Sequence, residues 1–442
     1  MKLLLLLPDG GIHKIRLGPL TRSMREAPLT LTLLAGLVPP ELGAELRLVD
    51  ESIQAVPLDE PFDLVAISAL TGTCARAYQL ADHYRARGAT VVLGGVHVTL
   101  RPEEAAVHAD AIVLGFAERT WPELLRDYRR GALKARYQDL DAPLEGLPMP
   151  RRDLQQRFGY MMPATVFATR GCKGTCDFCS VPAAGFGWKT RPVAEVVEEL
   201  RRTPQRRIAF NDVSITEDRD YAKELFTAMI PLKKSWGGLC TTRVAEDEEL
   251  LDLMTRSGCR YMLTGFESIH TPALQGIQKG FNRPETYADF MRKMHDRHIL
   301  IQGCFIFGFD FDTRDIFRET ADLVDQLSID IPRYAIYTPY PETGAYTRLK
   351  AEGRLLHEDW RHYDTQHVVF RPAHMSPGEL DAGFRWAYAR TFGLKSMLRR
   401  TLAAGLWFPV AFVGNLAYRR YARRLARDPR RILAAAPGPA RP

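Results

Sequence analysis

Short apolar runs alternate with segments of helical periodicity over the first part of the chain. The apolar runs at 3–7, 45–49, 64–68, 90–93 and 111–114 are typical of β-strands, whereas 75–87 and 122–130 have helical patterns. Strands that alternate with helices form parallel sheets covered by helices on both faces. We therefore predict an α/β domain over residues 1–145, built on a doubly wound parallel sheet.

The alternation resumes after a stretch at 146–165 that contains Pro148, Pro150 and Pro163, which we interpret as a linker. Strands are predicted up to Thr169 and at 207–213, 239–243, 261–266, 300–308 and 333–338, with helices at 193–202, 221–232, 247–257, 284–297 and 315–327. Repeated strand–helix units of this kind predict a partial (β/α)6 barrel over residues 166–375. In such barrels the chemistry gathers at the carboxyl ends of the strands.

Residues 376–442 are expected to form a helical, basic C-terminal region. An apolar run at 402–418 is interrupted by Pro409 and Asn415, and its length is at the lower limit for crossing a bilayer. Four arginines follow at 419, 420, 423 and 424. This pattern fits an interfacial segment that contacts anionic lipid, and it fits equally a helix packed on the barrel with a solvated basic end. We expect 434–442 to be disordered.

The formal net charge of +7 is concentrated in this region. Eleven Lys and Arg residues against one acidic residue lie between Lys395 and Pro442, so the rest of the chain is slightly acidic. A partnership of the whole protein with nucleic acid is therefore not predicted. The apolar core at 3–7 is cut off by Pro8, too short for a secretory signal peptide.

Three cysteines, Cys172, Cys176 and Cys179, lie within eight residues directly after an apolar run. A tight loop at this spacing can turn three thiolates towards one point. A cubane of four irons and four sulfides needs four ligands, so one iron would remain open. A structural zinc site is the alternative, but it would need a fourth ligand, and the nearest histidines, His108 and His270, are remote in sequence.

The loop Cys-x3-Cys-x-aromatic-Cys, with Phe178 at the aromatic position, resembles that of the radical S-adenosylmethionine (SAM) family. This resemblance implies a 4Fe–4S cluster on Cys172, Cys176 and Cys179, with SAM chelated by the open iron and cleaved to a 5′-deoxyadenosyl radical. It also implies that residues at the predicted strand ends hold SAM. They are Phe178, Asn211, Asp212, Arg243, Glu267, Ser268 and Gly308, whereas Cys240, Cys259 and Cys304 lie on apolar stretches and are interpreted as core residues.

Glycine-containing loops follow three strands of the first domain, where parallel sheets bind ligands. Followed by a radical SAM loop, this order of elements resembles cobalamin-binding domains fused to radical SAM barrels. The resemblance implies cobalamin contacts from Leu70, Thr71, Gly94, Gly95, Val96, Gly115 and Glu118. The pattern Asp-x-His-x-x-Gly, which supplies a histidine to cobalt in many cobalamin proteins, is absent, and neither His13 nor His97 fits it.

The resemblance to the hopanoid and chlorophyll-type branch implies transfer of a methyl group to an unactivated carbon of a lipid-like or polycyclic substrate. Alternatives are an oxidative cyclase or carbon–carbon bond former of the same build, or a non-catalytic iron–sulfur or zinc module. A methylthiotransferase would carry a second cysteine trio, whereas here only Cys74 is present. We expect an electron donor such as flavodoxin or ferredoxin. A cytoplasmic location is expected from the thiolate-bound cluster. The lipid-contacting alternative for the C-terminal region would place its peripheral contact at the inner face of the membrane.

Overall fold

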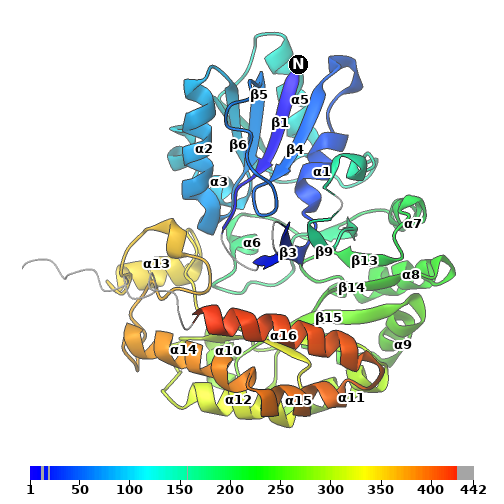
Figure 1. Cartoon of the computed structure of the whole chain (residues 1–442), viewed down its shortest axis with the longest axis vertical. Helices are drawn as coiled ribbons and strands as arrows, with labels where there is room; N and C mark the ends of the chain where they lie inside the picture. Colours follow the sequence, from blue (N-terminus) through cyan, green and yellow to red (C-terminus); the bar gives the residue numbers. More distant parts are fainter. Residues whose placement is uncertain (11–13, 18–19, 157, 426–442) are drawn as a thin grey trace, which may run out of the picture. The chain divides into compact units, whose positions relative to one another are not determined.

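The computed structural model describes residues 1–10, 14–17, 20–156 and 158–425, and the chain divides into two compact units (Figure 1). The first unit comprises residues 1–173 and 179–213, and the second comprises 174–178 and the chain from 214 onward. The segment 434–442, expected to be disordered, lies outside the described residues.

A parallel sheet with the order β4-β1-β5-β6-β7-β8 forms the centre of the first unit. Its strands are β1 (Lys2–Leu7), β4 (Glu45–Asp50), β5 (Leu64–Ser68), β6 (Thr90–Gly94), β7 (Ala111–Gly115) and β8 (Arg136–Asp139). The five predicted strands are confirmed with ends within one residue. The edge strand β8 was missed because its sequence, Arg-Tyr-Gln-Asp, contains one apolar side chain.

Helices cover both faces of this sheet (Figure 1). The helices α1 (Leu29–Gly36) and α5 (Ala117–Arg129) share one core with Leu3 and Leu5 of β1, and the Trp121 indole donates to the Leu34 carbonyl at 3.1 Å. The helices α2 (Cys74–Ala86), α3 (Val96–Leu100) and α4 (Pro102–Ala106) follow β5 and β6. Figure 1 shows α2 and α3 on the side of the sheet away from α1. The prediction of a doubly wound sheet is therefore confirmed.

A small second sheet in the first unit was not predicted. The hairpin of β2 (Lys14–Leu17) and β3 (Leu20–Glu26) pairs in parallel with β9 (Tyr160–Met162), which falls within the stretch interpreted as a linker. Short strands held by a distant partner leave little periodicity in the sequence.

The first unit also contains the elements on either side of the cysteine loop. The strand β10 (Thr165–Val166) pairs in parallel with β13 (Arg207–Phe210), and β11 (Thr169–Arg170) pairs antiparallel with β12 (Lys189–Thr190). Between them lie α6 (Ser180–Ala183) and α7 (Val193–Arg202). The cysteine loop therefore starts directly from a paired strand.

The second unit contains four parallel strands in the order β14 (Ser235–Cys240), β15 (Cys259–Glu267), β16 (Leu300–Phe307) and β17 (Ile331–Ile336). They alternate with α8 (Arg219–Met229), α9 (Glu248–Ser257), α11 (Tyr287–Asp296) and α12 (Ile316–Gln326), with α10 (Thr271–Gly276) before α11. The prediction of a strand at 239–243 was wrong in its bounds. The start of β14 was not predicted because two glycines in Ser-Trp-Gly-Gly-Leu-Cys interrupt the apolar run. Arg243 lies beyond the strand, in the 3₁₀ turn Thr242–Glu246.

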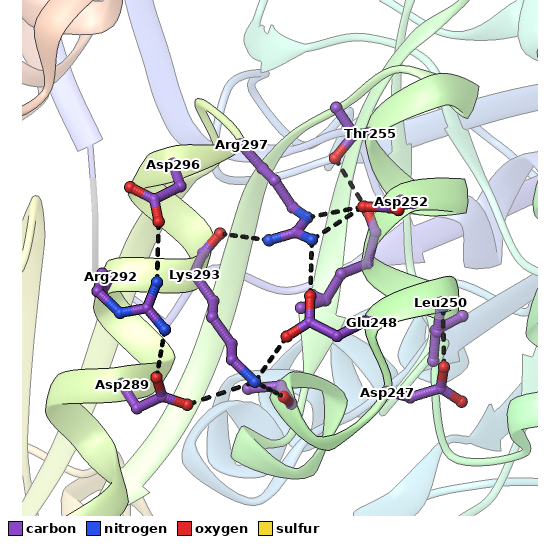
Figure 2. Close-up of polar contacts among 12 residues, drawn as sticks. Asp247, Glu248, Leu250, Asp252, Thr255, Asp289, Arg292, Lys293, Asp296 and Arg297 are labelled. Atoms are coloured by element: carbon purple, nitrogen blue, oxygen red, sulfur yellow. Dashed lines mark hydrogen bonds and ion pairs between the residues drawn. The ribbon is translucent and has the colours of Figure 1, made fainter.

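Ion pairs join α9 to α11 and the residue after it (Figure 2). Glu248 accepts from Lys293 Nζ at 2.8 Å and from Arg297 Nη2 at 2.7 Å, and Arg297 also reaches Asp252 at 2.8 Å. The carboxylates are more than half exposed, so solvent screens each pair and the network contributes little to stability.

The C-terminal region is helical, as predicted. It comprises α14 (Pro377–Thr391), α15 (Leu394–Ala403) and α16 (Phe408–Leu425), with α13 (Gly344–Ala351) earlier in the second unit. Ser376 begins α14 with a capping box, since its hydroxyl accepts from the Glu379 amide and the Glu379 carboxylate accepts from the Ser376 amide. Among the described residues, no helix combines the length and apolar character needed to cross a bilayer.

Candidate functional site

The cysteine loop connects β11 to α6. Cys172, Cys176 and Cys179 are half-buried and form no disulfide. Gly171, directly before the first cysteine, has a φ of +75°, and a Cβ there would collide with the Gly187 carbonyl. The loop therefore begins in a backbone conformation that suits glycine. Three accessible thiols on one short loop are the donor set that an iron–sulfur cluster requires.

The remaining cysteines differ in environment. Cys74, Cys240 and Cys259 are buried, and burial raises the pKa of the Cys240 thiol to about 12 and that of the half-buried Cys304 thiol to about 11. Thiols with raised pKa values stay protonated at neutral pH and are poor metal ligands. Cys240, Cys259 and Cys304, whose pKa values are raised by burial, act as core groups.

The middle of the cysteine loop belongs to the second unit, where Asp177 anchors it. The Asp177 carbonyl accepts from the Ala345 amide at 3.1 Å, and its carboxylate accepts from the Tyr337 hydroxyl at 3.4 Å. Burial raises the pKa of the Asp177 carboxyl. The Phe178 ring packs edge-on against Tyr337 with centroids 6.2 Å apart. Sequence reasoning gave Asp177 no role, although it stands inside the motif.

Asp212 supports the strand that leads into this loop. Its carboxylate is buried and accepts from the amides of Ala168 and Thr169, at 3.1 and 2.5 Å, and from the Thr169 hydroxyl at 2.6 Å. Burial, opposed by these hydrogen bonds, raises its pKa to about 6. Asp212 is therefore a positioning residue for the approach to Cys172, and its neighbour Asn211 lines a cavity in the same unit.

Glu267 ends β15 with a left-handed φ of +64°. Its carboxylate accepts from Lys279 Nζ at 2.6 Å, and both side chains are about nine-tenths buried. A Cβ at Gly265 would collide with the Glu267 carboxylate, so glycine makes room for this folded-back side chain. Ser268 is buried beside it, and its hydroxyl accepts from the His270 amide at 3.1 Å. Lys279 was missed because nothing in the sequence connects it to Glu267.

Arg243 lies near Lys279, the partner of Glu267, because both cations contact the Phe281 ring. The guanidinium carbon of Arg243 lies 6.0 Å from the ring centroid, and Lys279 Nζ lies 5.8 Å from it. The guanidinium is thus held on an aromatic face, where cations are attracted by the ring quadrupole. Arg243, predicted at the end of one strand, therefore lies near Glu267, predicted with Ser268 at the end of the next.

Gly308 follows β16 with a φ of +105°, and a Cβ there would approach Leu380 to 2.9 Å. Its amide and that of Phe309 donate to Asp312 Oδ2 at 2.9 and 3.0 Å. Burial raises the pKa of the Asp312 carboxyl to about 7. The turn at Gly308 is therefore shaped by a buried carboxyl that the sequence pattern did not reveal.

A cavity of about 330 Å³ lies within the first unit, at the carboxyl ends of β5, β6 and β7. Its walls are largely apolar, and α1, which sequence reasoning missed, supplies one of them. Six of the seven residues predicted to contact cobalamin line this cavity, namely Leu70, Gly94, Gly95, Val96, Gly115 and Glu118. Asn211 lines it as well.

Thr71 does not line this cavity. Its hydroxyl lies 3.3 Å from Nδ1 of His97, whose Nε2 lies 3.3 Å from a Glu104 oxygen. His97 is fully buried, and both ring nitrogens are in contact with polar partners. His97 thus holds the loop after β6 against the loop after β5, consistent with its failure to match the cobalt-ligand pattern.

Two lining glycines have backbone conformations that other residues rarely adopt. Gly95 has a φ of +100°, and a Cβ there would lie 2.6 Å from the Ala69 carbonyl, whereas Gly115 has a φ of +82°. Gly94 has ordinary φ, and its Cβ would meet nothing closer than 3.6 Å. Gly95 and Gly115 are thus required by the turns, whereas a Cβ at Gly94 would make only ordinary van der Waals contact with Val113.

Charge enters the cavity wall through Glu118 and Arg170, which form an ion pair of 3.0 Å. The Arg170 guanidinium also lies 4.5 Å from the Phe167 ring centroid, and the Phe116 and Phe186 rings lie 5.2 Å apart. Glycine-lined turns, aromatic walls and one ion pair fit a broad, mostly apolar cofactor with polar substituents, as cobalamin is. Arg170, Phe167, Phe116 and Phe186 were not singled out from the sequence.

Comparison with known proteins agrees with this geometry. A family profile described as the B12 binding domain matches residues 8–125, and one described as the Radical SAM superfamily matches residues 166–324. Fold, cysteine loop and cavity together define a radical SAM enzyme with a B12-binding domain.

Relatives narrow this class. The chain is 31% identical over 417 residues to bacteriochlorophyllide d C-12(1)-methyltransferase of Chlorobaculum tepidum, covering 90% of this chain and 89% of the relative. It is 30% identical over 402 residues to bacteriochlorophyllide d C-8(2)-methyltransferase of that organism, covering 85% and 87%. The solved structure of TsrM, a radical S-adenosylmethionine methyltransferase from Kitasatospora setae with cobalamin and a 4Fe-4S cluster bound, has a TM-score of 0.69 and 16% identity, covering 97% of this chain and 100% of that chain.

The chain therefore belongs to the family of cobalamin-dependent radical SAM methyltransferases. Its cofactors are a 4Fe–4S cluster, SAM and cobalamin. The predictions of family, fold class, enzyme class and cofactors are confirmed.

Proposed function

We propose that this enzyme methylates an unactivated carbon of a hydrophobic, polycyclic substrate of the tetrapyrrole kind. The observation that carries the proposal is that a chain with both a cysteine loop and a glycine-turned apolar cavity is similar over nine-tenths of its length to a bacteriochlorophyllide methyltransferase. When bound, the cluster supplies the electron that cleaves SAM, and cobalamin supplies the methyl group. An unactivated carbon offers no acidic proton to a general base, which is why such cofactors are needed.

The proposed roles of the residues follow from their chemistry. Cys172, Cys176 and Cys179 would ligate the cluster through three thiolates. Arg243 would pair with the SAM carboxylate, because a guanidinium binds carboxylates in bidentate fashion. The other residues proposed to hold SAM are Phe178, Asn211, Asp212, Glu267, Ser268 and Gly308, with Asp212 and Gly308 acting through the backbone turns that they shape.

Cobalamin would be held by the lining residues Leu70, Gly94, Gly95, Val96, Gly115 and Glu118, with Thr71 acting through His97. The division into a cobalamin domain (1–145), linker (146–165), barrel (166–375) and helical region (376–442) stays part of the proposal. So do a flavodoxin or ferredoxin as electron donor, a cytoplasmic location, and peripheral contact of the C-terminal region with the inner face of the membrane.

The test is anaerobic reconstitution with iron, sulfide and corrinoid. SAM, a one-electron reductant (dithionite or reduced flavodoxin) and bacteriochlorophyllides as substrate are then added, and the products are analysed by mass spectrometry. We expect 5′-deoxyadenosine and a product heavier by one CH2. The Cys172→Ala variant should release no 5′-deoxyadenosine, whereas the matched Cys304→Ala variant should. Release of 5′-deoxyadenosine with ring closure but no mass gain would identify a cyclase instead. An absence of cluster and of SAM cleavage would indicate a non-catalytic module.

A further inference from the structure

An uncovered apolar ridge runs along the C-terminal helices. Seven of the fifteen exposed large apolar side chains in the described part of the chain lie between positions 394 and 416. They are Leu394, Leu398, Leu402, Leu406, Val410, Val413 and Leu416, with exposed fractions from 38% to 80%; this set is the apolar ridge. Soluble proteins rarely leave so many large apolar groups together in water without a partner.

The ridge is continuous over two helices and their connection. Leu394, Leu398 and Leu402 are spaced by four residues and share one side of α15. Leu406, the most exposed of them at 80%, lies in the 3₁₀ turn Gly405–Trp407 between the helices. Val410 and Val413 continue it on α16, which is adjacent to α15 in Figure 1.

A buried polar network fixes which faces of these helices point inward. The Arg400 guanidinium, fully buried, donates to the Ile329 and Thr391 carbonyls at 2.9 and 2.8 Å and to Asn415 Oδ1 at 3.1 Å. Asn415 donates in turn to the Asp330 carbonyl at 2.8 Å. Rotating either helix to cover the ridge would leave these groups buried without partners, at high cost. The outward orientation of the ridge is therefore built in.

Positive charge borders the ridge. Lys395 and Arg399 are exposed on α15, and Arg420, Arg423 and Arg424 are exposed at the end of α16. The sequence contains no Asp or Glu from position 394 to 425. Apolar side chains that enter the interface and basic groups that meet lipid phosphates are the two attractions of an interfacial helix.

We infer that the α15–α16 hairpin docks on an anionic lipid bilayer, with the apolar ridge entering the interface and the five basic side chains contacting lipid phosphates. A second copy of the chain is a poorer occupant, since a symmetric dimer through this face would bring like charges together. The inference deepens the proposed function and rests on it only for its purpose, which is to collect a hydrophobic substrate from the membrane.

The test uses the full reconstituted enzyme and sedimentation with phosphatidylcholine vesicles, with or without 30% phosphatidylglycerol. We expect binding only to the anionic vesicles. The Arg420→Gln/Arg423→Gln/Arg424→Gln variant should bind on the order of 100-fold more weakly, as each basic group near such a surface contributes about fivefold. The Leu402→Ser/Leu406→Ser variant should also lose binding, whereas the matched Val107→Ser control, at an apolar position that is 71% exposed in the first unit, should not.

These positions are exposed, so unchanged far-ultraviolet circular dichroism and melting should accompany the loss. Vesicle binding that is equal for the variants and the wild type would overturn the inference. Lack of vesicle binding together with a dimer in light scattering that Leu402→Ser/Leu406→Ser dissociates would assign the ridge to a second copy instead. SAM cleavage measured in detergent solution reports on the proposed function separately, because it requires no vesicle.

Discussion

Arg170 Nη2 lies 3.0 Å from Glu118 Oε1, so the residue two positions before Cys172 is paired with the start of α5 in the cavity wall. The Glu118 side chain is only 2% exposed, whereas that of Arg170 is 32% exposed. The pair connects the strand that leads into the cysteine loop with the glycine turn after β7, both within the first unit. One interaction thus stabilises the approach to the cluster loop and the wall of the cavity.

Removing Arg170 should leave the Glu118 carboxylate buried without its countercharge. Breaking a buried pair costs about 3–5 kcal/mol, and the partial exposure of Arg170 lowers the expected loss for Arg170→Ala to about 2 kcal/mol. The measurement is urea unfolding of the cofactor-free protein, with corrinoid affinity measured in parallel. Combining it with Glu118→Gln should recover part of the loss. Arg119→Ala, which breaks a more exposed pair with Asp139, is the control and should have the smaller effect. Equal losses would argue against a role for the buried pair.

Neighbouring glycines of the β6 turn offer a matched pair of substitutions. Gly94→Ala adds a methyl group with no neighbour closer than 3.6 Å, so stability should change by less than about 1 kcal/mol. Because Gly94 lines the cavity, corrinoid affinity should fall by at least about tenfold if the cofactor approaches the backbone there. Gly95→Ala should instead destabilise the fold, since φ is +100° and the Ala69 carbonyl would be 2.6 Å from the new Cβ. The decisive measurement is corrinoid titration of the Gly94→Ala variant, once urea unfolding has shown that its free energy of unfolding equals that of the wild type. Unchanged corrinoid affinity would remove Gly94 from the site.

Asp212 predicts a pH dependence of stability. Burial raises its pKa to about 6 in the folded protein, against about 4 when unfolded. The folded state therefore favours the protonated form, so this contribution is fully present below about pH 4 and is lost as the pH rises through about 6. The free energy of unfolding of wild type relative to Asp212→Asn should fall by about 2–3 kcal/mol across that window. Urea unfolding at several pH values checks this, and a difference that rises with pH would contradict it. For Asp312→Asn the corresponding fall should extend to about pH 7, because burial raises the pKa of the Asp312 carboxyl to about 7.

Lys279 should contribute to stability because its partner, the Glu267 carboxylate, is buried. Lys279→Met leaves the Glu267 carboxylate, 10% exposed, without its ammonium, and a loss of about 3 kcal/mol is expected. SAM affinity should fall as well, because Glu267 would be free to leave its folded-back position beside Gly265. Thermal unfolding and SAM titration measure the two effects. Lys223→Met, which removes a more exposed lysine paired with Asp247 and Glu249, should be milder in both. A mild effect at Lys279 as well would show that Glu267 tolerates an unpaired charge.

Local sequence patterns were sufficient for much of the fold and for the cluster loop. Five strands are short apolar runs that can be identified by length and composition without knowledge of their partners: β1, β4, β5, β6 and β7. The cysteine spacing is equally local, because loop residues a few positions apart are held near one another by the chain itself. Elements with weak patterns were not predicted. The helix α1 is almost uniformly apolar and so lacks helical periodicity, and β8 has a single apolar residue.

The sequence by itself determined the chemistry of this enzyme: three thiols on one loop, glycine turns after parallel strands, and a basic C-terminal region. Only the tertiary structure decided which side chains meet, as with Arg170 and Glu118 or Lys279 and Glu267, and which sides of α15 and α16 stay uncovered. The physical reason is that a motif is encoded by covalent neighbours. An ion pair or a helix face is instead decided by packing between residues far apart in the chain, which minimises unpaired buried charge and exposed apolar surface over the whole molecule at once.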